Sequence, residues 1–396
     1  MIVLEFKLAG AASQYAALDE AIRTTQFIRN KCVRKWMDER GVKPYDLNRY
    51  CAILAKEYAF AGKLNSQARQ AAAERAAAAI VRFYDNCRAK KPGTKGYPQF
   101  QKDCHSVEYK TTGWTLDAVR RAITFTDGFK AGRFTLKGTR DLVGYALAQI
   151  KRVRVIRKAD GYYSQFCIDA ERRASVEPSG RALGIDLGLS HFYTDSEGAT
   201  VENPRHLRRS ERALKPLHRH VSSKVKGSRN RAKARGRLSR KHLKVRRQRK
   251  DFAVKAARAL IMSNGVIAYE DLQVSNMVKN RHLAKSIGDA GWRAFVTWLD
   301  YLAQVYGKVV VAVPPAYTSQ ECSGCGARVK KALSERTHVC PHCKTVLDRD
   351  HNAARNILTL GLRHLAETTA GHAESNAWGQ SALYLPDASP EDKVAG

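Results

Sequence analysis

The spacing of apolar residues divides the N-terminal part of the chain into a strand and a helical region. Residues 2–8 alternate between apolar and polar positions as a short strand does, whereas from residue 16 to 84 apolar positions recur every three or four residues, as in helices. Asn65 or Ser66 is suited to cap the last, alanine-rich helix of this region. We therefore predict a helical domain over residues 11–103.

A second pattern, of β-branched and aromatic residues separated by turns, begins near Ser106. It predicts a small antiparallel sheet that includes a hairpin between residues 153–156 and 162–168. The strand at residues 2–8 has no other sheet to join, so we expect it to complete this one and the helical domain to be an insertion. The predicted β domain comprises residues 1–10 and 104–180.

The C-terminal half has the pattern of an α+β domain. Three apolar strands are predicted, at residues 182–187, 266–269 and 309–313. An amphipathic helix over residues 292–306 and a last helix from Asp350 complete the pattern. This domain is assigned to residues 181–319 and 347–365, with a cysteine-rich segment, residues 320–346, inserted into it.

The chain is strongly basic. Its 70 Lys and Arg residues against 37 Asp and Glu give a formal net charge of +33 and a pI near 10. Residues 205–250 hold 20 of the basic residues and a single acid, Glu211. Because these charges repel one another unless a polyanion neutralises them, we predict a basic helical segment over residues 205–262 that binds nucleic acid. Its candidate contacts are Arg208, Arg209, Arg212, Arg229, Arg231, Arg235, Arg240, Lys244, Arg246 and Arg247.

Composition also indicates location and order. Uncharged apolar stretches such as residues 309–315 are far shorter than the ~18 residues that cross a bilayer, so we expect no membrane partner. Residues 1–5, Met-Ile-Val-Leu-Glu, do not have the pattern of a secretory signal, and we expect a cytoplasmic location at the nucleoid. Residues 366–396 are acidic and rich in Gly, Ser, Ala and Pro, which predicts a disordered tail.

Four of the nine cysteines have the spacing of a zinc site. Cys322-Ser-Gly-Cys325 and Cys340-Pro-His-Cys343 are two CxxC pairs separated by fourteen residues, which suits a closed, tetrahedral and therefore structural zinc site. His338 and His342 are alternative ligands, but four thiolates already complete the shell. The remaining cysteines are expected to be reduced and mostly buried: Cys32, Cys51, Cys87, Cys104 and Cys167.

Three acidic residues lie at the ends of predicted strands or at the start of a helix. Asp186 lies in Gly-Ile-Asp-Leu-Gly, Glu270 in Ile-Ala-Tyr-Glu-Asp-Leu, and Asp350 in Asp-Arg-Asp-His-Asn-Ala-Ala. Each alone also suits a turn or a cap. Together, in this order, they follow the layout of RNase H-like nucleases, in which converging carboxylates hold Mg²⁺ for phosphodiester hydrolysis.

These motifs resemble those of TnpB, a family of transposon-encoded RNA-guided nucleases related to type V CRISPR effectors. The matching segments are Gly96-Tyr-Pro-Gln-Phe100, Gly184-Ile-Asp-Leu-Gly188, Glu270-Asp-Leu272, Ser286-Ile-Gly-Asp-Ala-Gly-Trp292, Thr318-Ser-Gln-Glu-Cys322 and Asp348-Arg-Asp-His-Asn-Ala-Ala354. The likeness extends to about residue 364 and is most specific in the C-terminal half. It implies a RuvC-like nuclease domain with a zinc ribbon, a β-barrel wedge domain and a helical recognition lobe.

The resemblance also implies the reaction and its partners. A guide RNA would select double-stranded target DNA beside a short adjacent motif, and two Mg²⁺ ions on Asp186, Glu270 and Asp350 would support cleavage. Arg336 matches a position associated with the scissile phosphate. Asp271 and Asp348 lie near the metal site in sequence, although strand alternation directs Asp271 away from Glu270. Monomeric and dimeric assembly on the RNA both remain open, as do transposon and CRISPR association.

Three other functions fit parts of the sequence. A DDE-type transposase shares the RNase H-like fold, but a ribbon just before the last acid and a basic insert after the first favour the guided nuclease. A nuclease-inactive RNA-guided regulator keeps the basic surfaces and loses acids, whereas all three acids are present here. A zinc-ribbon RNA-binding protein explains the charge and the cysteines but gives the acids no role.

Overall fold

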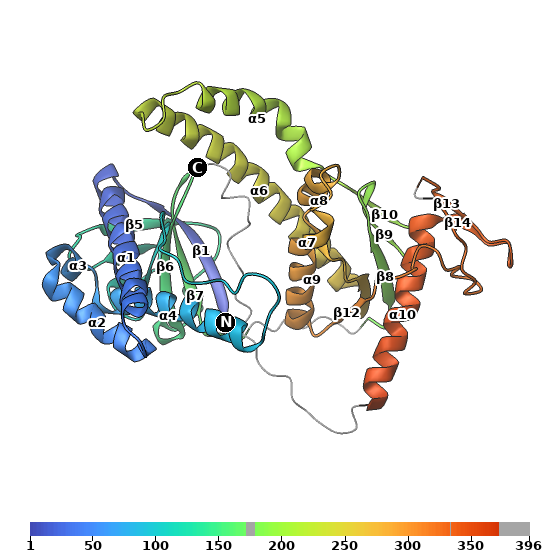
Figure 1. Ribbon diagram of the computed structural model, residues 1–396, viewed down its shortest axis with the longest axis horizontal. Helices are drawn as coiled ribbons and strands as arrows, with labels where there is room; N and C mark the ends of the chain where they lie inside the picture. Colours follow the sequence, from blue (N-terminus) through green and yellow to red (C-terminus); the bar gives the residue numbers. More distant parts are fainter. Residues whose placement is uncertain (172–178, 333, 372–396) are drawn as a thin grey trace. The chain divides into compact units, whose positions relative to one another are not determined.

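The computed structural model describes residues 1–171, 179–332 and 334–371. The chain forms two compact units that divide between Arg172 and Arg173 (Figure 1). Each unit has a sheet and a hydrophobic core of its own.

The first unit is built on a seven-stranded antiparallel sheet, with strand order β2-β6-β7-β1-β5-β4-β3. Its strands are β1 (Ile2–Ala9), β2 (Ser106–Tyr109), β3 (Trp114–Leu116), β4 (Ala122–Phe125), β5 (Gly132–Lys137), β6 (Ile150–Lys158) and β7 (Gly161–Ile168). As predicted, the first strand completes this sheet, where it pairs with β7 on one side and β5 on the other. The alternating apolar residues of β1 are buried in the core, which explains its pattern.

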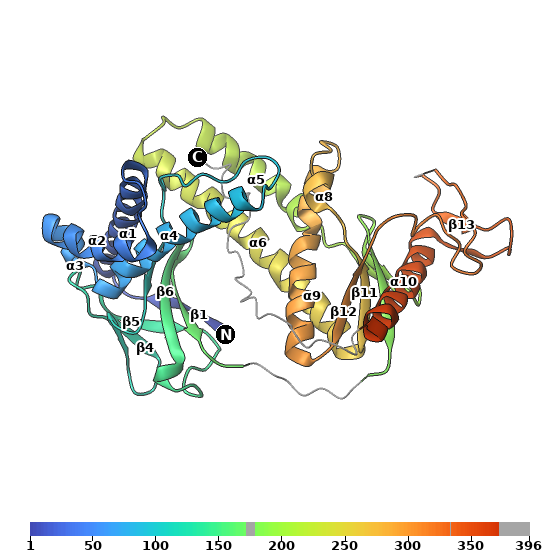
Figure 2. The same ribbon diagram turned by 60° about the horizontal axis from the view of Figure 1, so that its bottom comes forward.

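Four helices lie between β1 and β2 in the chain and cover one face of this sheet (Figures 1 and 2). They are α1 (Ala12–Asp38), α2 (Pro44–Glu57), α3 (Ala59–Lys63) and α4 (Ser66–Arg88). Of the two candidate caps of the alanine-rich helix, Asn65 has that role, since its side-chain oxygen accepts the N–H groups of Gln67 and Ala68 at 2.9 and 3.3 Å. The helices are thus inserted between two strands of one sheet.

The second unit has a five-stranded mixed sheet with strand order β10-β9-β8-β11-β12. Its strands are β8 (Ala182–Leu187), β9 (His191–Asp195), β10 (Thr200–Glu202), β11 (Val266–Glu270) and β12 (Val309–Val313). The first three form an antiparallel meander, whereas β11 lies parallel to both β8 and β12. Parallel strands end at the same edge of a sheet, so the C-terminal residues of β8 and β11 are neighbours.

Helices pack on both faces of this second sheet (Figure 1). They are α5 (His206–Ser222), α6 (Arg229–Ser263), α7 (Val274–Met277), α8 (Ala284–Ala290), α9 (Trp292–Tyr306) and α10 (Arg349–Gly371). The predicted apolar face of α9 is buried against the sheet through Phe295, Leu299 and Leu302. The short helices α7 and α8 were not predicted, because one or two turns are too short to show a helical period.

Helix α10 lies unusually close to the opposite face of the sheet. A β-carbon on Gly184 would lie 2.2 Å from the carbonyl oxygen of Ala354, and one on Gly361 would lie 2.5 Å from the β-carbon of Ala268. Glycine at these two positions therefore lets the helix and the strands approach each other. This approach brings the start of α10 to the end of β8.

The predicted disordered tail began too early. Helix α10 continues through Gly371, so residues 366–371 are helical, and residues 372–396 lie outside the described part. The helix is longer than predicted because Leu360 and Leu365 pack against the core formed by Ala268, Val311 and Ile357. Tertiary packing of this kind extends a helix beyond the point at which the local composition becomes polar.

Candidate functional site

Two of the three candidate acids lie side by side on neighbouring parallel strands. Ile185 of β8 pairs with Tyr269 of β11, so Asp186 and Glu270 are the next residues on each strand. Asp186 is partly buried, and Glu270 is 8% exposed. Both acids lie at the edge of the sheet where the parallel strands end.

The third acid, Asp350, lies in the first turn of α10. The carboxylate of Asp348 accepts the backbone N–H groups of Asp350 and His351 at 2.8 and 3.2 Å, so Asp348 caps the helix. Asp350 itself is held between two arginines: Arg336 Nη1 lies 3.6 Å from its Oδ2, and Arg349 Nε lies 3.4 Å from its Oδ1. The side chain of Asp350 is 16% exposed, so these cations compensate a largely buried charge.

The electrostatics of the site show that the three acids share one environment. Burial raises the pKa of Asp186 well above its usual value, and the negative charges of Glu270 and Asp350 raise it further. Burial also raises the pKa of Glu270, although a hydrogen bond from the hydroxyl of Thr318 partly opposes this shift. Two neighbouring buried carboxylates with raised pKa values disfavour their own ionised forms, which a cation would relieve.

The carboxylates form a looser group than a single-ion cage. In the described part of the chain, only the four clustered cysteines bring three or more potential ligand atoms within 4.8 Å of one another. Asp271, the other acid beside Glu270, is exposed, and its backbone N–H pairs with the carbonyl of Val313 at 2.9 Å. The structure therefore groups Asp186, Glu270 and Asp350 and separates Asp271 from them.

Sequence reasoning missed several residues that position these acids. The buried Thr318 donates its hydroxyl hydrogen bond to Glu270 from a segment 48 residues further along the chain. Asn352, fully buried on α10, accepts the N–H of Ser323 at 2.9 Å and donates to the carbonyl of Glu321 at 2.7 Å. Asn356 donates to the carbonyls of Thr318 and Glu321, both at 2.8 Å. The recognised motifs include Thr318 and Asn352, which was the available signal.

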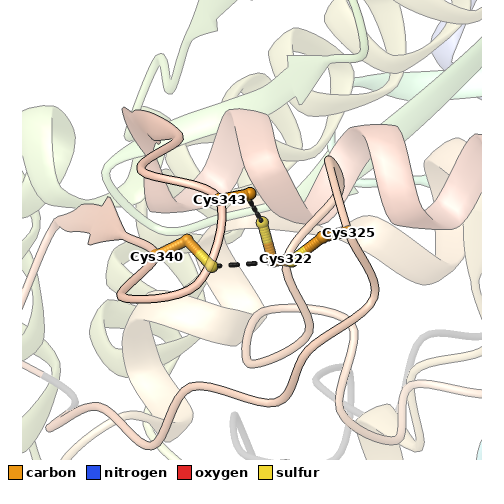
Figure 3. Close-up of side chains that lie close together, drawn as sticks. All are labelled: Cys322, Cys325, Cys340 and Cys343. Atoms are coloured by element: carbon orange, nitrogen blue, oxygen red, sulfur yellow. Dashed lines mark hydrogen bonds between the residues drawn. The ribbon is translucent and has the colours of Figure 1, made fainter.

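The four clustered cysteines converge as the CxxC spacing predicts (Figure 3). Their sulfurs approach in two pairs: Cys322 and Cys343 at 3.5 Å, and Cys325 and Cys340 at 3.6 Å. A tetrahedral Zn–S₄ centre with bonds of about 2.3 Å separates its sulfurs by about 3.8 Å, so this geometry fits zinc closely. The hairpin β13 (Thr337–Val339) and β14 (Val346–Asp348) carries the second pair and leads directly into α10.

The surroundings of the sulfurs also suit a thiolate site. A β-carbon on Gly324 would lie 2.8 Å from Thr345 Oγ1, so only glycine fits between the two knuckles. Hydrogen bonds from the hydroxyl and the backbone N–H of Thr345 lower the pKa of Cys343 to about 6, which favours the thiolate. His338 is buried with its Nδ1 hydrogen-bonded to Lys331, and His342 is exposed; neither joins the cysteine group.

The remaining five cysteines have the predicted character. All nine cysteines are free thiols. Cys32, Cys51, Cys104 and Cys167 are buried, whereas Cys87 is exposed.

Helices α5 and α6 pair to form a basic hairpin, residues 206–263. Its few apolar residues, among them Leu214, Leu238 and Val245, are buried, so they hold the two helices together. Of the ten candidate nucleic-acid contacts, nine are exposed and Arg231 is partly buried. Although α6 is 35 residues long, none of the described helices combines the length and the apolar character needed to cross a membrane.

The base of this hairpin adjoins the acidic site. A polar cavity of about 260 Å³ is lined by Arg205 and Arg208 together with Ser190 and Asp289. Ser190 also accepts a hydrogen bond from Arg336 at 3.3 Å, and Arg336 is the arginine that contacts Asp350. Basic side chains thus extend from the hairpin to the carboxylates within the second unit.

Comparison with known proteins identifies relatives over most of the chain. A family model described as a probable transposase matches residues 165–281, and one described as the Cas12f1-like TNB domain matches residues 292–357. A putative RNA-guided DNA endonuclease of Streptomyces pristinaespiralis is 32% identical over 359 residues, which are 88% of this chain and 86% of that protein. The chain belongs to the TnpB family.

Other comparisons agree with this assignment. The putative RNA-guided DNA endonuclease InsQ of Escherichia coli is 30% identical and covers 72% of this chain and 73% of its own. Among solved structures, Cas12f1 in complex with sgRNA and target DNA superposes with a TM-score of 0.54 at 15% identity, over 87% of this chain and 82% of that one. The mini-RNA-guided endonuclease Cas_phi3 gives 0.57 at 9% identity, over 91% and 92%. The chain thus has the TnpB/Cas12 fold.

Proposed function

We propose that this TnpB-family chain is an RNA-guided DNA endonuclease and that its second unit cleaves DNA as a RuvC-like, RNase H-like nuclease. The observation that carries this proposal is the meeting of Asp186, Glu270 and Asp350 in one environment, at the ends of two parallel strands and the start of α10. The antiparallel meander followed by parallel strands is the strand arrangement expected of this fold. The names of the relatives support the same activity.

The same three acids would hold two Mg²⁺ ions, which would activate a water and stabilise the leaving oxygen of a phosphodiester. Two ions about 3.5–4 Å apart need more widely spaced ligands than one ion does, which suits the looser carboxylate group. Thr318 would orient Glu270 through its hydrogen bond. Arg336, which is half-exposed beside Asp350, is placed to contact the scissile phosphate.

The cysteine cluster would hold one structural zinc ion within a ribbon over residues 320–346. Four thiolates leave no open position, so this ion would take no part in the reaction. Asn352 and Asn356 tie the first knuckle to α10, close to Asp350. The zinc would therefore stabilise the wall of the cleavage site.

In the first unit, we assign the seven-stranded sheet to a wedge domain and helices α1–α4 to a recognition lobe. A closed β-barrel is part of this proposal. The predicted bounds are residues 1–10 and 104–180 for the wedge and 11–103 for the lobe. The basic hairpin would lie against the duplex that the guide RNA forms with its DNA target, because its exposed arginines and lysines suit the phosphates of both strands.

The proposed function is tested by coexpressing the protein with the DNA that flanks its gene. RNA that copurifies with the protein is sequenced, and the complex is then given a plasmid library with a matching target beside randomised positions. We expect a discrete RNA and Mg²⁺-dependent cleavage of plasmids that share one short motif. Binding without cleavage would favour the nuclease-inactive regulator, and RNA-independent strand joining would favour the transposase.

The basic hairpin should set the salt dependence of RNA binding. Arg240→Gln combined with Lys244→Gln removes two exposed charges one helical turn apart on α6. Because each lost phosphate contact releases fewer counterions, the slope of log K against log salt should become shallower by about 0.9 per contact on duplex nucleic acid. Filter binding between low and moderate salt measures this slope.

A matched control removes the same charge from the same helix beyond the basic segment. Lys255→Gln combined with Arg258→Gln changes two exposed residues, of which Lys255 already pairs with Asp251 at 2.8 Å. This control should keep the wild-type slope. Equal slopes for both double variants would contradict a specific role of the hairpin.

A further inference from the structure

Tyr317 has an unusual backbone conformation next to the acidic site. Its φ angle is +67°, in the left-handed region that bulky residues rarely adopt, and the residue is 48% exposed. The following residue is the buried Thr318, whose hydroxyl contacts Glu270. An exposed aromatic ring thus lies one residue from a side chain that holds a candidate catalytic acid.

Several contacts keep Tyr317 in this conformation. Its carbonyl accepts the N–H groups of both Gln320 and Glu321 at 2.9 Å, and the carbonyl of Thr318 accepts a hydrogen bond from Asn356 of α10 at 2.8 Å. The tight turn that starts the zinc ribbon therefore needs this backbone geometry. Nothing in these backbone contacts requires a tyrosine, because glycine adopts the same conformation without strain.

The ring of Tyr317 has one covered face. The guanidinium carbon of Arg328 lies 3.5 Å from the ring centroid, and Arg328 is fixed in turn by Glu321, with Nη2 to Oε1 at 3.5 Å and an antiparallel backbone bridge. A planar cation on one face leaves the exposed part of the ring as a rigid, flat platform. Such platforms bind the faces of nucleobases.

The charge around this platform suits a polyanion. Residues 316–345 contain five basic residues and two acids, and Arg328, Lys330 and Lys331 follow one another closely. A nucleic-acid strand that passes the carboxylates would find cations beside Tyr317 for its phosphates. The partner of the platform is therefore a nucleotide rather than an apolar side chain.

We propose that Tyr317, backed by Arg328, stacks on one unpaired base of the DNA strand that enters the cleavage site. This inference rests on the proposed function and adds to it a base-binding subsite next to Glu270. Stacking holds the strand by a base while the acids act on its backbone. Because every base has a flat face, the subsite accepts any sequence.

The test removes the ring without disturbing the turn. Tyr317→Gly suits the φ of +67° and should fold as well as the wild type, whereas Tyr317→Phe keeps a stacking ring. Guided cleavage is measured on a series of targets, each lacking a single base near the cleavage position. In the wild type and Tyr317→Phe, one abasic position should lower kcat/KM by about 5- to 150-fold, which is the cost of one lost stack. In Tyr317→Gly that position should have no further effect.

A second measurement does not depend on cleavage. The base analogue 2-aminopurine is placed at the sensitive position, and Asp186→Ala is added to both proteins to prevent cutting. Stacking should quench the fluorescence of the bound complex, and Tyr317→Gly should restore it. Tyr45→Ala, which removes an exposed tyrosine on α2, is the matched control and should behave as the wild type.

The two possible failures are distinguishable. If the wild type cleaves guided targets but its abasic series and its fluorescence match those of Tyr317→Gly, the stacking subsite is wrong and the nuclease assignment stands. If the wild type cleaves no guided target, the proposed function is wrong and the inference fails with it.

Discussion

Replacing Asp186 or Glu270 by alanine is expected to lower guided DNA cleavage by about a thousandfold or more and to leave nucleic-acid binding unchanged. Each variant removes a ligand of the proposed ion pair, and the loss of several kcal/mol of transition-state stabilisation corresponds to several factors of ten in rate. Binding depends on base pairing and on the phosphate contacts of the basic hairpin, which are intact. Plasmid cleavage and filter binding in Mg²⁺ measure the two properties side by side.

The chain offers a close control for this experiment. Asp271 follows Glu270 directly but is exposed and directed away from the other acids, so Asp271→Ala should cleave at nearly the wild-type rate. Wild-type cleavage by Asp186→Ala would show that the carboxylates are structural. Equal losses in all three variants would show a general effect on folding instead.

Stability without metal distinguishes functional from structural acids independently. The pKa of Asp186 is raised in the folded protein, so its ionisation opposes folding, and wild-type stability falls as the pH rises through that pKa. Asp186→Asn has no such charge. In the presence of a chelator it should be at least as stable as the wild type, by an amount that grows with pH, in thermal unfolding followed from mildly acidic to alkaline buffer.

Most of the sheets and long helices could be predicted because their apolar residues repeat with the period of the element. Helix α9 shows this for helices, and β1 shows it for strands, since the alternation over residues 2–8 matches its buried face. The end of α10 was wrong because Leu365 packs against strands that are distant in sequence. Local composition contains no information about such a contact.

The candidate site shows the same division between local and long-range information. Asp186, Glu270 and Asp350 stand out in the sequence because each ends a strand or starts a helix within a recognisable motif. The sequence left Asp348 as a candidate ligand, whereas the structure uses its carboxylate to cap α10. The left-handed backbone of Tyr317 follows from a turn that only the folded ribbon defines, so no sequence pattern predicts it.

Replacing Cys340 by serine is expected to release zinc and to unfold the ribbon, with loss of cleavage as a consequence. Cys340 is fully buried, and its sulfur lies 3.6 Å from that of Cys325, so serine removes one of four ligands at the centre of the cluster. Zinc supplies about 10–16 kcal/mol of folding free energy in zinc-finger peptides, which is more than a ribbon of this size gains from its own core. Elemental analysis should find about one zinc per wild-type chain and much less in the variant.

Hydrogen exchange then shows how far the damage extends. Exchange should increase over residues 318–349 and at the first turn of α10, where Asn352 and Asn356 contact the ribbon, and should remain unchanged in the first unit. Cys87→Ser, which changes an exposed free cysteine of the first unit, should keep both the zinc and cleavage. A wild type that contains no zinc would contradict the metal assignment. A Cys340→Ser protein with full zinc and full cleavage would mean that the remaining three thiolates are sufficient and that the fourth ligand is not required to hold Asp350 in place.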